Sequence, residues 1–256
     1  MAAFFICGSG IGTAGHAEGL THIVSGGPNS GGIMIKKNLS LWVLSLTTFF
    51  LLACSNGSEA SGDAKPALAP ASSESYIKIA QPVRTSDPNK IEVSEVFWYG
   101  CSHCFSFEPM VHAWAEKLPS DVVFVRSPAM WNELMVTHAQ AFYAAEALGV
   151  LDKVHQPLFD EINLKKNPLR DRDAIEKVFL AHTEVSAEDF RKAFDSFGVK
   201  SQVRQADARA RSYGIAGTPE IIVNGKYRVT GRSAGSKANM LKVADQLIAQ
   251  ERAAKK

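Results

Sequence analysis

Cys101 and Cys104 form a C-x-x-C motif between a predicted strand and a predicted helix. Residues 91–98 precede the motif and are rich in β-branched and aromatic side chains, which favours a strand. Pro109 lies within the helix and predicts a kink, because proline cannot donate a backbone hydrogen bond. A second short strand at 122–125 completes a β-α-β unit. The helix itself is indicated by apolar residues at helical spacing, namely Phe107, Met110, Val111 and Trp114.

A long helical region follows this unit. Residues 131–213 carry apolar side chains at the spacing of amphipathic helices. Ser186 is the predicted N-cap of a helix at 189–194, and Gly198 is its predicted end. We interpret these apolar stripes as core packing and find no cofactor-binding motif among them.

A β-hairpin and a last helix complete the chain. The dipeptide Asn224-Gly225 separates predicted strands at 220–223 and 226–229, and Asn-Gly between such runs is a strong hairpin signal. A final amphipathic helix is predicted over 236–249.

The order of these elements predicts an α/β protein with a thioredoxin fold and an inserted helical domain. A C-x-x-C beside a β-α-β unit is typical of thioredoxin-like redox proteins. We place the first part of the thioredoxin fold at 76–130, the helical insertion at 131–200 and the second part at 201–256.

The first part of the chain has the composition of a targeting segment. Lys36-Lys37 precedes an apolar run at 39–53, which is the layout of a secretory signal. This run is shorter than the ~20 residues of a spanning helix. An uncleaved membrane anchor is the alternative. Because Met34 stands just before the basic pair, we expect residues 1–33 to come from an upstream start site and to be absent from the working protein.

Residues 51–54, Leu-Leu-Ala-Cys, resemble a bacterial lipoprotein box. In that family the cysteine is diacylated and becomes the first mature residue. The resemblance predicts a lipoprotein signal peptide at 34–53 and a lipidated Cys54. Residues 54–75 are rich in Ser, Ala, Gly and Pro and are predicted to be a flexible tether. Such an anchor would hold the folded domain near a membrane. The alternative is an ordinary signal with an unused cysteine.

The composition narrows the classes of function. The chain has 28 basic and 26 acidic residues and a formal net charge of +2, so it lacks the basic bias of nucleic-acid-binding proteins. Its four cysteines are too few for a disulfide scaffold in 256 residues. We therefore expect no nucleic-acid partner, and the C-x-x-C motif carries the functional prediction.

The position of the motif favours thiol chemistry. A helix N-terminus offers unpaired N–H groups and a partial positive charge, both of which stabilise a thiolate at Cys101. His103 adds a donor near the same sulfur and a full charge when protonated. Because a stable thiolate favours the reduced form, the Cys101–Cys104 disulfide is predicted to be a strong oxidant. Cys104 lies one turn deeper and is predicted to resolve the mixed disulfide.

Two other uses of the motif remain open. One is a zinc site, for which His103 and His112 could add ligands to the cysteine pair, although zinc usually needs four ligands. The other is a structural disulfide that never turns over. We expect neither, and we expect no metal or organic cofactor.

Two segments resemble the DsbA family of periplasmic disulfide oxidants. Residues 95–108, which contain Cys101-Ser102-His103-Cys104, look like that family's active-site segment. Residues 217–227, which begin Gly-Thr-Pro, are similar to its cis-proline segment. The resemblance covers roughly residues 76–250, including the helical insertion. The best-known members carry proline where this chain has Ser102, which leaves the redox potential open.

The resemblance implies roles for three further residues. Pro219 would follow a cis peptide bond after Thr218 and face the Cys101 sulfur. The backbone of Thr218 would then pair with an extended substrate chain. Glu95 matches the family's buried acid, for which we predict a partly neutral carboxyl that moves the proton of Cys104. A solvent-facing strand residue is the alternative for Glu95.

The predicted function is donation of disulfides to unfolded exported proteins that carry free cysteines. The resemblance implies a periplasmic location and a quinone-linked membrane oxidase of the DsbB type that regenerates the oxidised form. A disulfide reductase or isomerase is one alternative. A lipid-anchored binding or chaperone module with inert cysteines is another. We expect a monomer, because no clear dimerisation domain precedes Tyr76.

Overall fold

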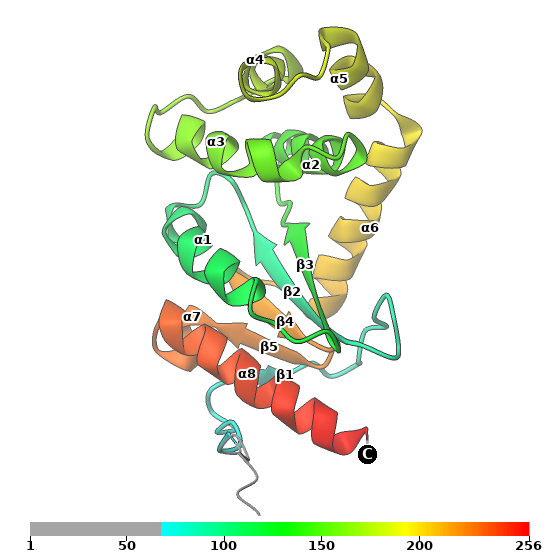
Figure 1. Ribbon diagram of the computed structural model, residues 1–256. Helices are drawn as coiled ribbons and strands as arrows, with labels where there is room; N and C mark the ends of the chain where they lie inside the picture. Colours follow the sequence, from blue (N-terminus) through cyan, green and yellow to red (C-terminus); the bar gives the residue numbers. More distant parts are fainter. Residues whose placement is uncertain (1–67, 256) are drawn as a thin grey trace, which may run out of the picture. The chain divides into compact units, whose positions relative to one another are not determined.

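The computed structural model describes residues 68–255 of the chain (Figure 1). The predicted upstream extension at 1–33, the signal peptide at 34–53 and the lipidated Cys54 lie outside the described residues. Within residues 68–255, no helix is both long and apolar enough to cross a membrane.

A five-stranded mixed sheet forms the centre of the fold, in the order β1-β5-β4-β2-β3. Strand β2 pairs in parallel with β3 and antiparallel with β4, and β5 is antiparallel to both β4 and β1. All residues of β2 are buried, as expected for a strand covered on both faces. The strands are β1 (Ile77–Lys78), β2 (Ile91–Phe97), β3 (Val122–Pro128), β4 (Glu220–Val223) and β5 (Tyr227–Thr230).

Helices cover both faces of this sheet. On one face lie α1 (Ser102–Ala115), the short α7 (Gly231–Ala234) and α8 (Lys237–Ala254). On the other face α6 (Phe197–Tyr213) packs against the sheet. Because side chains alternate along a strand, Ile221 and Val223 contact the α1 and α8 side while Ile222 contacts the α6 side.

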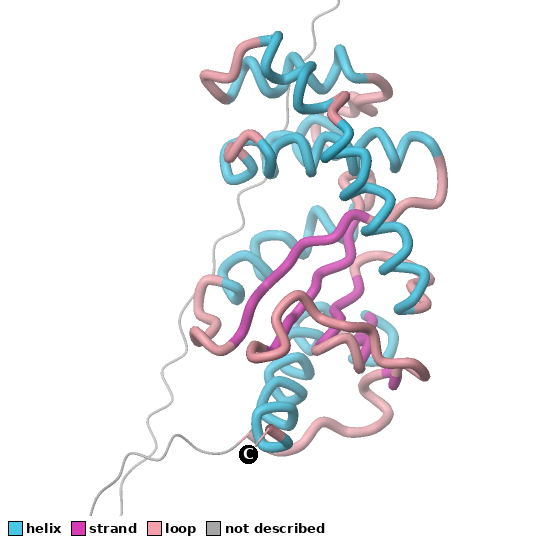
Figure 2. Tube along the Cα trace, turned by 90° about the vertical axis from the view of Figure 1, so that its right-hand side faces the viewer, coloured by secondary structure: helices cyan, strands magenta, loops and turns pink. Residues whose placement is uncertain are grey.

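Four inserted helices form a separate layer beyond the ends of β2 and β3. Figure 2 shows the strands of the sheet between this layer and the C-terminal helix α8. Its core contains Phe142, Phe159, Phe179 and Phe190, which are fully buried. Phe97, the last residue of β2, and Tyr99, in the turn that follows, extend this core towards the motif. The four helices are α2 (Glu133–Ala147), α3 (Leu151–Asn163), α4 (Arg172–His182) and α5 (Ala187–Phe194).

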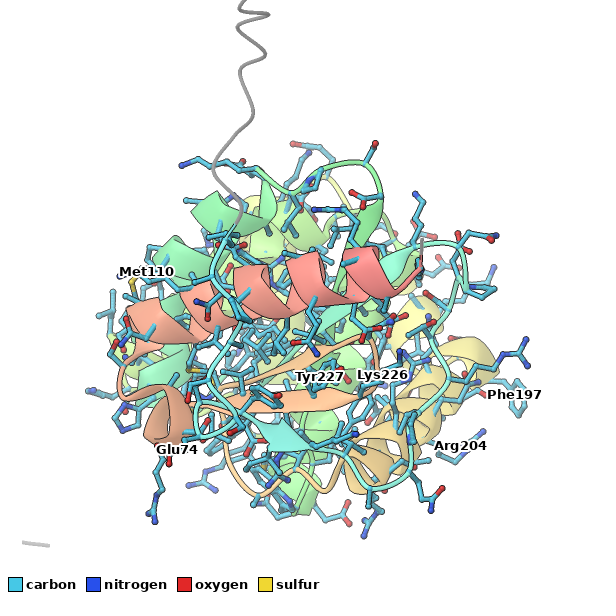
Figure 3. All side chains as sticks on the ribbon, turned by 90° about the horizontal axis from the view of Figure 1, so that it is seen from below. Glu74, Met110, Phe197, Arg204, Lys226 and Tyr227 are labelled. Atoms are coloured by element: carbon cyan, nitrogen blue, oxygen red, sulfur yellow. The ribbon has the colours of Figure 1, made fainter. Side chains whose placement is uncertain are left out.

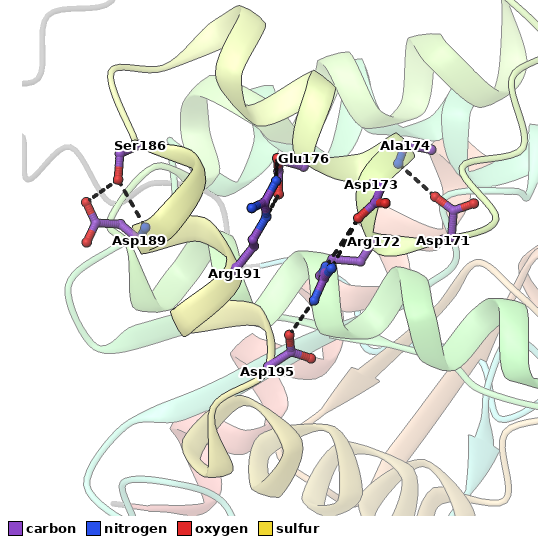
Figure 4. Close-up of polar contacts among 9 residues, drawn as sticks. All are labelled: Asp171, Arg172, Asp173, Ala174, Glu176, Ser186, Asp189, Arg191 and Asp195. Carbon is purple, nitrogen blue, oxygen red and sulfur yellow. Dashed lines mark hydrogen bonds and ion pairs between the residues drawn. The ribbon is translucent and has the colours of Figure 1, made fainter.

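Charged side chains join α4 to α5 on the outside of this layer (Figure 4). Arg191 donates two hydrogen bonds of 2.7 Å to the Glu176 carboxylate. Arg172 forms an ion pair with Asp195 at 2.9 Å. Ser186 accepts a hydrogen bond from Asp189 N at 3.0 Å, which confirms its prediction as an N-cap.

The prediction that Gly198 ends this helix is wrong. Helix α5 ends at Phe194, and Gly198 lies in the first turn of α6. The reason is a second capping residue, because Ser196 accepts a hydrogen bond from Val199 N at 3.1 Å and starts a new helix there. The predicted domain boundary after residue 200 therefore falls inside α6.

Helix α6 begins with an exposed aromatic side chain. Phe197 is 80% exposed, and Figure 3 shows it projecting outward together with Arg204. The guanidinium of Arg204 lies 5.7 Å from the Phe197 ring centroid, a cation–π contact that shields one ring face.

The predicted hairpin is confirmed. Asn224 and Gly225 have φ values of 51° and 63°, and Lys226 N donates to the carbonyl oxygen of Val223 at 3.0 Å, which closes a tight turn. Val223 pairs with Tyr227, so three residues connect the antiparallel strands. A Cβ on Gly225 would lie 2.0 Å from the carbonyl oxygen of Val83, so only glycine fits. Strand β5 is shifted by one residue from its predicted range. The last helix runs to Ala254, beyond its predicted end at residue 249.

Candidate active site

Cys101 is the N-cap of α1. It has extended backbone angles, and its sulfur accepts a hydrogen bond from Cys104 N at 3.4 Å. Its own N–H donates to the carbonyl of Trp98 at 3.0 Å, which closes a tight turn after β2. A Cβ on Gly100 would lie 2.3 Å from the Trp98 ring, so the turn needs glycine there. The reduced pair has one accessible sulfur, since Cys101 is partly exposed and Cys104 is buried.

The loop before β4 brings a second segment to this sulfur. The Thr218–Pro219 peptide bond is cis. The Cys101 thiol donates a hydrogen bond to the carbonyl oxygen of Thr218 at 3.3 Å, across 117 positions of sequence. The two segments meet because β4 pairs with β2, with Glu220 opposite Val96.

The surroundings lower the pKa of Cys101 to about 5. The largest cause is a hydrogen bond from the Cys104 thiol, and Thr218 and the backbone of Cys104 and His103 add to it. Partial burial opposes these effects. Cys101 is therefore a thiolate near neutral pH, which is the nucleophilic and leaving form of the residue.

The second cysteine has the opposite character. Burial raises the pKa of Cys104 far above its ordinary value, and the neighbouring Cys101 raises it further. The negative charge of Glu95 acts in the same direction, so these two groups interact. Cys104 thus needs a proton whenever it leaves a disulfide.

His103 acts on the site in a different way from the prediction. Its side chain is exposed, and its contribution to the lowered pKa of Cys101 comes from its backbone hydrogen bond. Residues 68–255 contain no group of three or more His, Cys, Asp or Glu side chains placed to hold a metal ion. His112 Nε2 lies 3.4 Å from Glu116 Oε1, and both side chains are exposed.

Glu95 lies in β2 and is 1% exposed, so the alternative of a solvent-facing residue is wrong. Burial is the main cause that raises its pKa to about 8, and the nearby Glu108 raises it as well. Arg126 lowers it, with Nε 3.5 Å from Glu95 Oε2. At neutral pH the Glu95 carboxyl is therefore mostly neutral and can donate a proton.

Four further polar groups continue from Glu95 towards the inserted helices. Arg126 Nη2 donates to Glu108 Oε1 at 2.6 Å. The other Glu108 oxygen lies 3.4 Å from His155 Nε2. His155 Nδ1 lies 2.8 Å from the Tyr99 hydroxyl. Burial alone would raise the pKa of Glu108, but His155 and Arg126 together bring it below its ordinary value.

No sequence pattern predicted a role for Arg126, Glu108 or His155, although the first two carried a signal. Arg126 is a charged residue in a half-buried strand, directly opposite Glu95 in the parallel pair. Glu108 stands one helical turn after Cys104 and therefore on the same face of α1. His155 lies within an apolar helical stripe and had no such mark.

Comparison with known proteins decides the family. The chain is 45% identical over 185 residues to the thiol:disulfide interchange protein DsbA of Pseudomonas syringae, covering 72% of this chain and 86% of that protein. The chain belongs to the DsbA family. Residues 121–238 also match the family described as a DSBA-like thioredoxin domain.

Solved DsbA structures confirm the predicted fold. The crystal structure of Pseudomonas aeruginosa DsbA is 42% identical, covers 70% of this chain and 93% of its own, and superposes with a TM-score of 0.67. DsbA of Xylella fastidiosa is 31% identical, covers 72% and 98%, and gives 0.67. The α/β thioredoxin fold with inserted helices is thus confirmed, and the protein is a thiol:disulfide oxidoreductase of the DsbA family.

Proposed function

We propose that this DsbA-family protein donates the Cys101–Cys104 disulfide to unfolded exported proteins with free cysteines. The observation that carries the proposal is the partly exposed Cys101 sulfur at a helix N-terminus, with a pKa lowered to about 5. A thiolate this stable is a good leaving group, so the reduced form is favoured and the disulfide is oxidising.

The reaction takes two exchange steps. A substrate thiolate attacks Cys101 Sγ, the Cys101–Cys104 bond breaks, and Cys104 leaves with the electron pair. Because the pKa of Cys104 is raised, the departing sulfur takes up a proton, and the neutral Glu95 carboxyl supplies it. A second substrate thiolate then attacks the substrate sulfur of the mixed disulfide, and Cys101 leaves as a thiolate. The substrate gains a disulfide and the protein is left reduced.

Thr218 and Pro219 are proposed as the substrate-binding segment. The carbonyl oxygen of Thr218 lies 3.3 Å from Cys101 Sγ. Thr218 is followed by the buried Pro219, which stands directly before the first residue of β4. An extended substrate chain could add to this backbone as a further strand, which would align a substrate cysteine with Cys101.

The location and partners are also proposals. The lipoprotein-type box ending at Cys54 supports export and lipid anchoring to a bacterial membrane, on the periplasmic side. A DsbB-type quinone-linked oxidase would accept the electrons of the reduced pair. Mass spectrometry of the membrane-extracted protein tests the anchor, because diacylation adds a lipid mass to a chain that starts at Cys54.

Two cysteine variants test the reaction. With an oxidised, disulfide-containing peptide, the Cys101 thiolate of Cys104→Ser is expected to displace one peptide thiol and to accumulate as a mixed disulfide, because no second cysteine resolves it. Cys101→Ser is expected to form none. Disulfide formation that is unchanged in Cys101→Ser would favour a binding module with inert cysteines. Equilibration of the wild type with glutathione buffers gives the potential, and a value as low as that of thioredoxin, about −270 mV, would favour a reductase.

A further inference from the structure

Glu220 is a buried acid next to the cis peptide bond. It is 4% exposed and directly follows Pro219 as the first residue of β4, whose other members are Ile221, Ile222 and Val223. Burying a carboxylate in a sheet is costly unless partners compensate for the lost water. The surroundings of this side chain show what its two oxygens do.

One oxygen of Glu220 holds the backbone of the loop before the cis bond. Oε1 accepts hydrogen bonds from Gly217 N at 3.1 Å and from Ala216 N at 3.4 Å. Both donors belong to the short segment that connects α6 to β4 and carries Thr218. The carboxylate therefore fixes the two peptide units that precede Thr218.

The other oxygen faces a guanidinium from the neighbouring strand. Glu220 Oε2 lies 3.4 Å from Arg228 Nε, and neither atom has a hydrogen-bond partner among the described residues. A Cβ on Gly214 would lie 3.3 Å from Arg228 Nη1, so the guanidinium also lies against the end of α6. The pair of Glu220 and Arg228 thus connects the start of β4 and the end of α6, which are the two ends of the loop that carries Thr218.

We propose that Glu220 is a positioning residue that fixes Thr218 opposite Cys101 Sγ and thereby sets how strongly the disulfide oxidises substrates. Glu220 does not touch the reacting sulfur and acts through Gly217 and Thr218. The inference rests on the proposed role of Thr218 at the active site. Loosening the loop would also displace the Thr218 hydroxyl, whose hydrogen bond lowers the pKa of Cys101, and so would destabilise the thiolate.

The test compares two double variants of the full chain that differ only in the loop acceptor. Glu220→Ala with Arg228→Gln removes the acceptor without leaving an unpaired buried guanidinium. Glu220→Gln with Arg228→Gln keeps a carbonyl oxygen for Ala216 and Gly217. The rate of alkylation at Cys101 is measured against pH, by mass spectrometry of the peptide that contains Cys101. The glutathione equilibrium constant of the Cys101–Cys104 pair is measured in parallel.

In the alanine double variant the pKa of Cys101 is expected to rise by about 1, since a hydrogen bond to a charged group has an effect of this order. The equilibrium constant for oxidising glutathione is expected to fall by up to tenfold. The glutamine double variant is expected to restore both values. If the pKa of Cys101 and the equilibrium constant are the same in the two double variants, the inference is wrong. Thermal unfolding followed by circular dichroism checks that both variants are folded.

Thr218→Val separates this inference from the proposal on which it rests. This variant removes the Thr218 hydroxyl and leaves the Glu220 contacts in place. If it raises the pKa of Cys101 while the alanine double variant does not, the role of Glu220 is wrong and that of Thr218 stands. If it has no effect, the Thr218 hydroxyl does not stabilise the Cys101 thiolate and the inference fails, whereas the proposed pairing of the Thr218 backbone with substrate stands. If the alanine double variant does not fold, the glutamine double variant is compared with wild type, and it is expected to show less than a twofold change in the equilibrium constant. A larger change would contradict the acceptor role.

Discussion

Trp98 donates its indole N–H to Nδ1 of His138 at 3.0 Å. Because Nδ1 accepts, Nε2 carries the hydrogen and donates to the carbonyl oxygens of Pro168 and Leu169 at 3.1 and 3.2 Å. The same Trp98 provides the carbonyl that accepts from Cys101 N. A neutral imidazole thus ties the turn before Cys101 to a loop of the inserted helices.

This bond makes folding stability depend on pH. Burial lowers the pKa of His138 below its ordinary value of 6.5, so the unfolded chain binds the proton more readily than the folded one. The contribution of His138 to stability is therefore present above pH 6.5 and is lost as the pH falls below it.

Two variants at this position test the effect. His138→Gln can keep one acceptor and one donor but cannot titrate. We expect urea unfolding at pH 7.5 and 5.5 to show a smaller loss of stability in this variant. His138→Leu serves as the control that leaves Trp98 and two carbonyls unpaired, and it is expected to cost about 1–3 kcal/mol at pH 7.5. An equal loss in wild type and His138→Gln would show that His138 does not carry the effect.

The pKa of Cys101 predicts a difference between the two redox forms. Its folded value of about 5 lies below the ordinary value of 9.0, so the thiolate stabilises the reduced protein above pH 9 and this contribution is lost as the pH falls to 5. The oxidised protein has no thiol to titrate at this position. We expect the stability of the reduced form, relative to the oxidised form, to increase from pH 5 to pH 8 in urea unfolding. Reduced Cys101→Ser is the control: its stability, relative to that of the oxidised wild type, should show no such increase. A flat difference in the wild type would contradict the lowered pKa.

Much of this fold was predictable because its signals are local. The C-x-x-C after β2, the Asn224-Gly225 turn and the cap at Ser186 each depend on a few neighbouring residues. The error at Gly198 has a local cause as well, since the serine that starts α6 stands only two residues before it. Local chemistry thus located most elements to within a few residues.

The site was predictable only where sequence neighbours or a family resemblance pointed to it. The resemblance named Glu95 and Thr218, yet no local pattern shows that Arg126 lies beside Glu95 or that Glu220 holds the loop. These contacts depend on strand register and on which helix covers which face. His155 reaches the site from 51 positions beyond Cys104, so only the assembled fold places it there.

Arg126 joins the two buried acids, and this predicts the effect of removing it. It lies 2.6 Å from Glu108 and 3.5 Å from Glu95, with its side chain 15% exposed. Arg126→Met leaves the Glu108 carboxylate buried without its main partner, and such losses cost about 3–5 kcal/mol. Adding Glu108→Gln removes the unpaired charge and should restore part of the stability. Urea unfolding of the two variants at pH 7 measures the difference. A double variant as unstable as Arg126→Met would show that the lost packing of Arg126 dominates over charge.

Glu95 is predicted to set the pH dependence of Cys104 chemistry. When reduced protein reacts with oxidised glutathione, Cys104 must lose its proton to attack the mixed disulfide, and the Glu95 carboxylate can accept it. Because the pKa of Glu95 is about 8, the rate of this step should rise with pH and level off above that value. Glu95→Gln cannot accept the proton, so we expect the step to slow at pH 8. General-base effects start at about a hundredfold, and we expect the rate to fall by at least about tenfold.

The folding stability of Glu95→Gln should change in the opposite direction. Because the pKa of Glu95 is raised, the stability that the neutral carboxyl contributes is lost between pH 4.5 and 8. The variant should therefore be more stable than wild type at pH 8, by urea unfolding of the reduced form. Stopped-flow tryptophan fluorescence follows the exchange, and an unchanged rate profile in Glu95→Gln would remove Glu95 from the mechanism.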